Sequence, residues 1–160
     1  MRTHTAQALH DEHMATLRLM ERLEALLGRP EPDAPARMAP VLRDIERAVA
    51  LEIGPHFDFE EHSVFPHLRD AGADEMIALL TEEHAQIQPL ALRLATLARS
   101  CREAGFTPAQ SAEFGMVAAD LTARLVSHVQ KEEMGMLPVL DDLLDPDTDG
   151  ALSLALAALR

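Results

Sequence analysis

Apolar residues recur with the period of a helix near the start of the chain. From residue 5 to residue 27 they are spaced three or four positions apart, which places them on one face of a helix. Three further helical segments are expected over 37–70, 73–104 and 108–144. β-Branched residues are sparse and never alternate with polar residues over a long run, so the pattern predicts no strands. The predicted fold class is therefore all-α.

Proline, glycine and capping residues indicate where these helices bend and begin. Gly54-Pro55 lies inside the second segment and is expected to kink it, because proline lacks the backbone N–H and clashes with the preceding turn. Asp74 is a candidate N-cap for the third segment. Thr107 and Gln110 form a candidate capping box for the fourth segment, with a proline at its first helical position.

Four helices with short connections predict an up-down-up-down antiparallel four-helix bundle. The two halves of the chain also resemble each other: "DEHMATLRLMERLEAL" resembles "EEHAQIQPLALRLATL", and "HFDFEEHSVFP" resembles "HVQKEEMGMLP". The bundle is therefore predicted to be an internal two-fold duplication of one helical hairpin. We expect the bundle domain to cover residues 1–146, and a tail or short helix to cover 147–160.

The repeated motifs contain candidate metal ligands. His56 and Glu60 are four residues apart and so project from one face of a helix, and the same His-x-x-x-Glu spacing recurs 72 residues later. One histidine in each of the other two helices completes the set. The six candidate ligands are His13, His56, Glu60, His84, His128 and Glu132. Imidazole and carboxylate together suit iron, zinc, manganese or copper. Four imidazoles and two carboxylates exceed one tetrahedral site and suit two ions bridged by both carboxylates.

The alternative is that these residues have no metal to bind. A single histidine on a helix is usually exposed or satisfied in the core, and a Glu-Glu pair usually lies on a solvated face. That interpretation leaves the matching positions in the two halves unexplained. Burying such groups unpaired would also cost about 2–7 kcal/mol each. The repetition therefore favours a metal site.

Several neighbouring residues have less certain roles. His10 lies three residues before His13 and is a candidate additional ligand. Glu61 is expected to be solvated or to contact a ligand, and Phe57 to help keep water from the site. The remaining candidates are expected to lie on the surface or in the packing; they are His62, His67, Met134, Met136 and Cys101.

In these motifs the chain resembles the haemerythrin-like HHE cation-binding family. The shared motifs are "DEH", "HFDFEE" followed by "FP", "EEH", and "HVQKEE" followed by "LP", and the resemblance runs from "LHDEH" to "EEMGMLP". It implies a four-helix bundle holding a non-haem di-iron centre, often oxo- or hydroxo-bridged, with ligands at the six positions given above.

The chain differs from the oxygen-carrying haemerythrins at two places. Those proteins have a second histidine four residues after the histidine of the third helix, where this chain has Gln88. They have aspartate five residues after the histidine of the fourth helix, where this chain has Glu132 at four residues and Glu133 at five. These differences bring it closer to HHE members implicated in iron sensing, nitric-oxide response and iron-centre repair.

The composition of the chain argues against some classes of partner. The formal net charge of −13 repels phosphate backbones, so no nucleic-acid partner is expected. No apolar run reaches the roughly 18 residues of a membrane span. The first residues contain no apolar signal core and Cys101 is the single cysteine, which together predict a cytoplasmic protein.

Three functions fit the sequence. The first is a non-haem di-iron protein that binds or senses oxygen, nitric oxide or peroxide, or handles iron, so that its partner is a small diatomic or peroxide molecule. The second is a di-iron enzyme of peroxidase, catalase-like or nitric-oxide-reducing type. The third is a redox-inert zinc-binding helical module. All three use one ligand set, so the sequence leaves open whether the protein is an enzyme.

Overall fold

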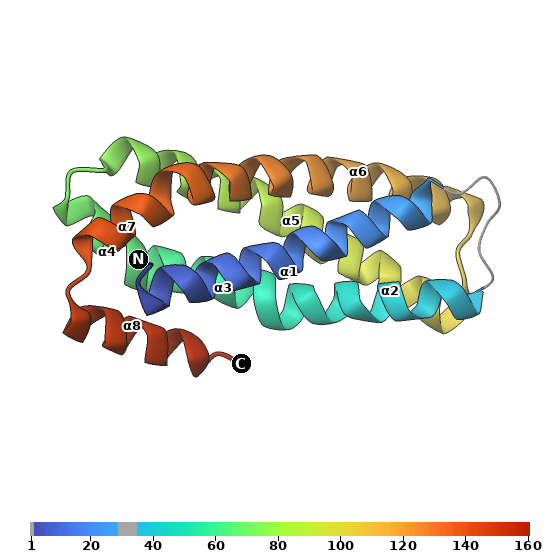
Figure 1. The fold of residues 1–160 in the computed structure, drawn as a ribbon. Helices are drawn as coiled ribbons and strands as arrows, with labels where there is room; N and C mark the ends of the chain where they lie inside the picture. The colour runs from blue at the N-terminus through green and yellow to red at the C-terminus, as the bar shows by residue number, and fades with distance from the viewer. Residues whose placement is uncertain (1, 29–34) are drawn as a thin grey trace.

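The computed structural model describes residues 2–28 and 35–160, which form four long helices and one short one (Figure 1). The first long helix is α1 (His4–Leu27) and the third is α5 (Asp74–Ala104). The second and fourth each consist of several segments. The second joins α2 (Pro35–Ala48), η1 (Val49–Ile53), α3 (Gly54–Phe59), η2 (Glu60–Val64) and α4 (Phe65–Asp70), and the fourth joins α6 (Pro108–Lys131), η3 (Glu132–Met136) and α7 (Leu137–Leu143).

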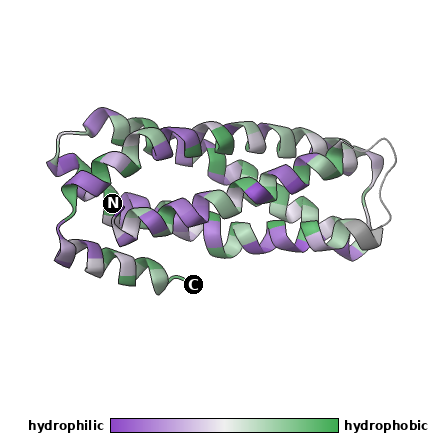
Figure 2. Ribbon diagram, viewed as in Figure 1, coloured by the Kyte–Doolittle hydropathy of each residue, from purple (hydrophilic) through white to green (hydrophobic). Residues whose placement is uncertain are grey.

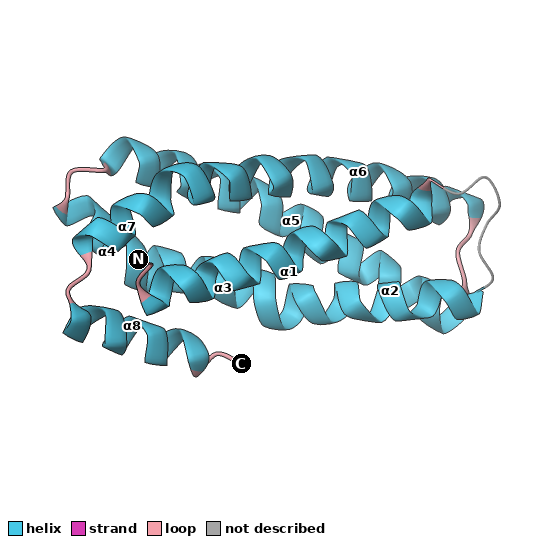
Figure 3. Cartoon of the chain, in the orientation of Figure 1, coloured by secondary structure: helices cyan, strands magenta, loops and turns pink. Residues whose placement is uncertain are grey.

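The four long helices run alternately up and down along one another (Figure 1). The connections between them are short, and within the described residues there is no strand (Figure 3). A fifth helix, α8 (Pro146–Ala157), follows and packs along α1 in the same direction (Figure 1). The predicted all-α four-helix bundle with a short C-terminal helix is thus confirmed.

Local signals account for most helix ends. Thr107 and Gln110 form the predicted capping box, with hydrogen bonds of 3.0 and 3.2 Å between each side chain and the other residue's backbone N–H. The prediction that Asp74 caps the third helix was wrong. The N-cap is Ala73, and Asp74 is the first helical residue, where a carboxylate still interacts favourably with the helix dipole.

The predicted kink at Gly54-Pro55 takes the form of a wider, π-helical turn. The π turns η1, η2 and η3 each end two residues before a proline: Pro55, Pro66 and Pro138. A proline cannot donate to the helical ladder and clashes with the carbonyl four residues earlier, and a π turn relieves that clash. After η2 and η3 the backbone N–H of Phe65 donates to the carbonyl of Glu60, and that of Leu137 to the carbonyl of Glu132. Two of the three turns therefore begin at a candidate ligand.

Two apolar clusters fill the bundle, one toward each end. Hydrophilic and hydrophobic residues are interspersed along the helices, as amphipathic packing requires (Figure 2). One cluster includes Met20, Ile87 and Leu125, and the other includes Leu9 and Leu80. The candidate ligands lie between them along each helix, so the bundle has a buried polar layer between two apolar layers.

In the part of the chain that the structure describes, none of the helices is both long enough and apolar enough to cross a membrane.

Candidate metal centre

All six candidate ligands meet in the polar layer of the bundle. They form two groups, one of His13, His56, Glu60 and Glu132 and one of His84, His128, Glu60 and Glu132. Within each group, one ligand atom from every residue lies within 4.8 Å of the others, and all six side chains are buried. Glu60 and Glu132 belong to both groups. The arrangement thus provides two adjacent cation positions with both carboxylates between them.

The distances between ligand atoms are those of neighbours in a coordination sphere. The Nε2 atom of His56 lies 3.0 Å from Glu60 Oε1, one helical turn away. The equivalent pair in the second half, His128 Nε2 and Glu132 Oε1, is 2.9 Å apart. Ligands bonded to one ion at about 2.0–2.2 Å, at right angles to one another, are separated by about 3 Å.

The two halves of the chain also meet across the centre in matching contacts. His13 Nε2 lies 3.0 Å from Glu132 Oε2, and His84 Nε2 lies 3.2 Å from Glu60 Oε2. Each carboxylate therefore contacts histidines of both halves. This is the contact pattern that a bridging ligand makes.

Five of the inward-facing atoms have no hydrogen-bond partner although they are buried. They are His13 Nε2 and both carboxylate oxygens of Glu60 and of Glu132. The nearest ring nitrogens lie 2.9–3.2 Å from these oxygens but do not form hydrogen bonds with them. Uncompensated burial of ionised groups is costly, and a bound cation removes that cost. The residues therefore fit metal cations.

Four further glutamates, here called the outer glutamates, contact the imidazoles on the side that faces away from the centre. Each candidate histidine has its Nδ1 atom within hydrogen-bond distance of a glutamate on another helix. The pairs are His13–Glu133 at 2.7 Å, His56–Glu12 at 2.6 Å, His84–Glu61 at 2.8 Å and His128–Glu83 at 2.8 Å. A carboxylate can accept a hydrogen bond only from a nitrogen that carries a proton. Nδ1–H is therefore the donor, and Nε2 faces the centre. The outer glutamates thus fix the tautomer and the ring orientation that metal binding needs.

Only part of this outer layer was predicted from the sequence. Glu61 was expected to be solvated or near a ligand, and it contacts His84. Glu12, Glu83 and Glu133 were not assigned this role. The signal was present, because Glu12 and Glu83 each directly precede a candidate histidine at matching positions in the two halves.

Positive charges support three of the outer glutamates. Arg160 donates two hydrogen bonds to Glu12 Oε1, at 2.8 and 3.2 Å. Burial raises the pKa of Glu12, but its hydrogen bond and charge interaction with His56 and the same interactions with Arg160 outweigh burial and lower that pKa overall. Lys131 pairs with Glu83 in the second half. The carboxylates facing these imidazoles are therefore held in the ionised form.

His10 belongs to this outer layer. Its Nδ1 atom lies 2.8 Å from Glu133 Oε2, while His13 contacts the other oxygen of the same carboxylate. It is absent from both groups of ligand atoms. The structure therefore places His10 beside a residue that orients His13.

Without metal, the centre binds protons. Burial lowers the pKa of His84, but its interactions with the negatively charged carboxylates of Glu132 and Glu60 outweigh burial and raise that pKa to about 9. The pKa of His56 is also raised well above its usual value, because Glu60 and Glu12 outweigh burial. Burial raises the pKa of Glu132, but the surrounding histidines hold it well below its usual value. A metal ion entering this centre must therefore displace protons from imidazole.

Aromatic rings enclose one side of the centre. The ring of Phe57 stacks on the imidazole of His84, with centroids 3.9 Å apart and planes 10° apart. Phe65 lies nearly parallel to the same imidazole at 5.8 Å. Both phenylalanines are buried, so they keep water away from the His84 side. A cavity of about 20 Å³ adjoins His13, His56, Phe57 and Glu132, which is room for about one water-sized molecule.

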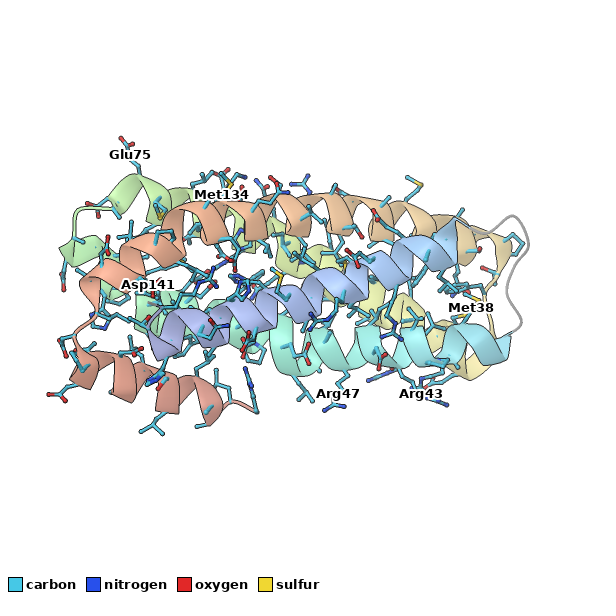
Figure 4. The ribbon with its side chains drawn as sticks, viewed as in Figure 1. Met38, Arg43, Arg47, Glu75, Met134 and Asp141 are labelled. Carbon is cyan, nitrogen blue, oxygen red and sulfur yellow. The ribbon has the colours of Figure 1, made fainter. Side chains whose placement is uncertain are left out.

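The remaining candidates lie outside the centre. His62 is exposed, and its Nδ1 contacts the backbone carbonyl of Asp58 at 2.8 Å, whereas His67 is half-buried. Met134 is 82% exposed on the surface of the fourth long helix, and Met136 is buried in an apolar cluster (Figure 4). Cys101 is partly buried and packs against the other cluster.

Comparison with known proteins gives one match to a family. The model of the Hemerythrin HHE cation binding domain matches residues 4–140. A comparison with curated proteins found no match. The matched range contains all six candidate ligands and ends before α8.

Proposed function

Since the chain belongs to the hemerythrin HHE cation-binding family, we propose that its buried His/Glu cluster holds two non-haem iron ions and binds or senses a small molecule such as oxygen, nitric oxide or peroxide. The observation that carries this proposal is the pair of ligand groups that share Glu60 and Glu132, whose four carboxylate oxygens have no other partner. Two adjacent cations bridged by both carboxylates would satisfy all of them.

The donor set supports iron. Each group offers two imidazole nitrogens and two carboxylate oxygens. This mixture of ligands suits iron, whereas structural zinc sites are typically rich in cysteine thiolates. An iron ion that accepts six ligands would have positions left for a small molecule beside the four protein ligands. Iron, when bound, would also supply the redox chemistry.

The protein's own residues have separate tasks in this proposal. Glu60 and Glu132 offset the charge of the two cations. The outer glutamates hold the imidazoles in position, and Phe57 and Phe65 exclude water from the His84 side. The small cavity beside His13 and His56 supports the proposal, because it offers room for a small molecule next to the candidate ligands.

Metal analysis and absorption spectroscopy test the proposal. Protein purified from iron-replete cells is expected to contain about two iron ions per chain and to show near-ultraviolet charge-transfer absorption that azide changes. A colourless protein with about one zinc per chain would contradict it and favour the zinc-binding module.

Variants test the assignment of the ligands. Glu60→Ala and Glu132→Ala are expected to lose iron, because each removes a carboxylate shared by both groups. Asp58→Ala is the control, since Asp58 is exposed and two residues from Glu60. Full iron content in Glu60→Ala would reject the bridging role.

A further inference from the structure

A groove lies beside the metal centre, between α8 and the second long helix. Its volume is about 350 Å³. Apolar side chains from α1, from the second long helix, and from α8 with the turn after it form much of its wall: Ala15, Leu51, Pro55, Leu156 and Leu159. Its inner end is formed by Glu12 and His56, so the groove reaches a candidate ligand from the surface.

The groove and the small cavity at the centre share part of their lining. Glu12, Glu52 and His56 border both spaces. The small cavity also contacts His13, His128 and Glu132, which are candidate ligands. The three shared residues therefore lie between the groove and the centre. Glu52 is exposed, so its side chain can move aside without leaving a buried gap.

We propose that this groove is the route by which a small uncharged molecule reaches the metal centre, and that α8 forms its outer wall. The inference rests on the proposed function and extends it to a part of the chain outside the matched domain, since the match ends at residue 140 and α8 begins at Pro146.

Size and charge define the class of molecule that can pass. The inner cavity of about 20 Å³ admits a molecule of one to a few atoms. Among the charged residues of the groove, three are acidic (Asp11, Glu12 and Glu52) and two are basic (Arg47 and Arg160). With the chain's net charge of −13, this lining does not concentrate anions. The apolar wall and this charge balance favour an uncharged molecule such as nitric oxide.

Polar contacts at both ends fix α8 as a wall. At its start, Asp149 accepts hydrogen bonds from the backbone N–H groups of His4 and Thr5, both at 2.8 Å. At its end, Arg160 binds Glu12. Between them Leu156 is 1% exposed, whereas Leu159 is 45% exposed at the edge of the groove. A group attached at residue 159 would therefore block the groove while the buried contacts of α8 stay in place.

Thiol labelling tests this route. In a Cys101→Ala background, Leu159→Cys is modified with a bulky maleimide. Leu154→Cys is the matched control, because Leu154 is 74% exposed on α8, five residues before Leu159, and does not line the groove. The association and dissociation rates of nitric oxide with the iron(II) protein are measured by stopped flow.

A blocked route slows arrival and departure alike and leaves the ligand bound as before. The labelled Leu159→Cys variant is expected to show both rates reduced by about tenfold or more, with the dissociation constant unchanged. The labelled Leu154→Cys variant should keep the rates of the unlabelled protein. Equal rates in the two labelled variants would overturn the proposal.

A second measurement separates this inference from the proposed function. If the unlabelled protein binds no nitric oxide, the proposed function fails, and the groove is then tested in metal-free protein with dissolved xenon. Xenon is expected to shift the methyl resonances of Leu51 and Leu156, and the label at residue 159 should abolish the shifts. Absence of these shifts would overturn the groove as a site for small molecules.

Discussion

Glu82 and Glu83 are adjacent in the sequence but have different surroundings. Glu83 accepts a hydrogen bond from His128 Nδ1 at 2.8 Å and pairs with Lys131, whereas Glu82 is exposed and contacts only Gln86, at 3.5 Å. Loss of a carboxylate that orients a metal-ligating histidine typically weakens metal binding by about 10–100-fold. Glu83→Gln is expected to show a loss of that size in a competition titration with a chromogenic chelator.

Glu82→Gln is the matched control and should bind metal as the unsubstituted protein does. If both substitutions weakened binding equally, the effect would come from net charge instead of from the contact with His128.

The protonation of the centre predicts opposite pH dependences for the metal-free and metal-loaded protein. The pKa of His84 is raised from 6.5 to about 9. Its contribution to the stability of the metal-free fold is therefore complete below pH 6.5 and is lost as the pH rises through 9. The pKa values of Glu60 and Glu132 lie below the usual 4.5, so their contribution is present above pH 4.5 and is lost as the pH falls further. These groups favour the metal-free fold most between pH 4.5 and 6.5.

Metal affinity should change in the other direction. A metal ion must displace the proton of His84, so its apparent affinity should rise toward pH 9, by about tenfold per pH unit for each proton released. Thermal unfolding of both forms between pH 5 and pH 9 checks the prediction. A metal-free protein that becomes more stable up to pH 9 would contradict it.

At the scale of the helices, two π turns begin at Glu60 and Glu132, the glutamates shared by the two groups of candidate ligands. Pro138 follows η3, which begins at Glu132. In Pro138→Ala the clash is removed and an N–H is restored, so a regular α-helix becomes available over this turn. The helix would then rotate relative to the centre, and metal binding should weaken by about tenfold or more, as expected when the orientation of ligands is disturbed.

Pro89→Ala provides the control within the same bundle. Pro89 lies inside α5, which continues through it as an α-helix with no π turn. Its replacement should leave metal affinity unchanged. Equal affinity losses in Pro89→Ala and Pro138→Ala would indicate a general effect of helix stiffness.

The helices and the six clustered residues could be predicted from the sequence because their signals are local or repeated. The Thr107 capping box is a local pattern, and the candidate ligands recur in the second half after 71 or 72 residues. The π turns were missed because proline predicts a distortion without defining its type. The contacts of Glu12 and Glu133 were missed because they depend on how one helix is rotated toward another. The position of α8 depends on Asp149, a contact across 144 residues of chain.

At the scale of the whole molecule, the two halves of the duplication interlock. Glu12 contacts His56 within the first hairpin, and Glu83 contacts His128 within the second. Glu61 holds His84 of the other hairpin, and Glu133 holds His13 in the same way. Each hairpin supplies two candidate histidines and one shared carboxylate, so each cation position needs both hairpins.

With this division of the candidate ligands, bound metal ions would cross-link the two halves, and we expect the halves to associate without a covalent connection. Gly72, with a φ of 82°, lies in an exposed turn between the hairpins, where a protease site can be inserted. After cleavage, the fragments 1–72 and 73–160 are expected to elute together in size-exclusion chromatography with iron(II) and to separate when a chelator removes it. The Glu132→Ala fragment should not rejoin its partner, and co-elution that persisted in chelator would show that the apolar layers suffice. If the fragments associate only with metal, the two hairpins behave as the subunits of a metal-dependent heterodimer, although one chain encodes both.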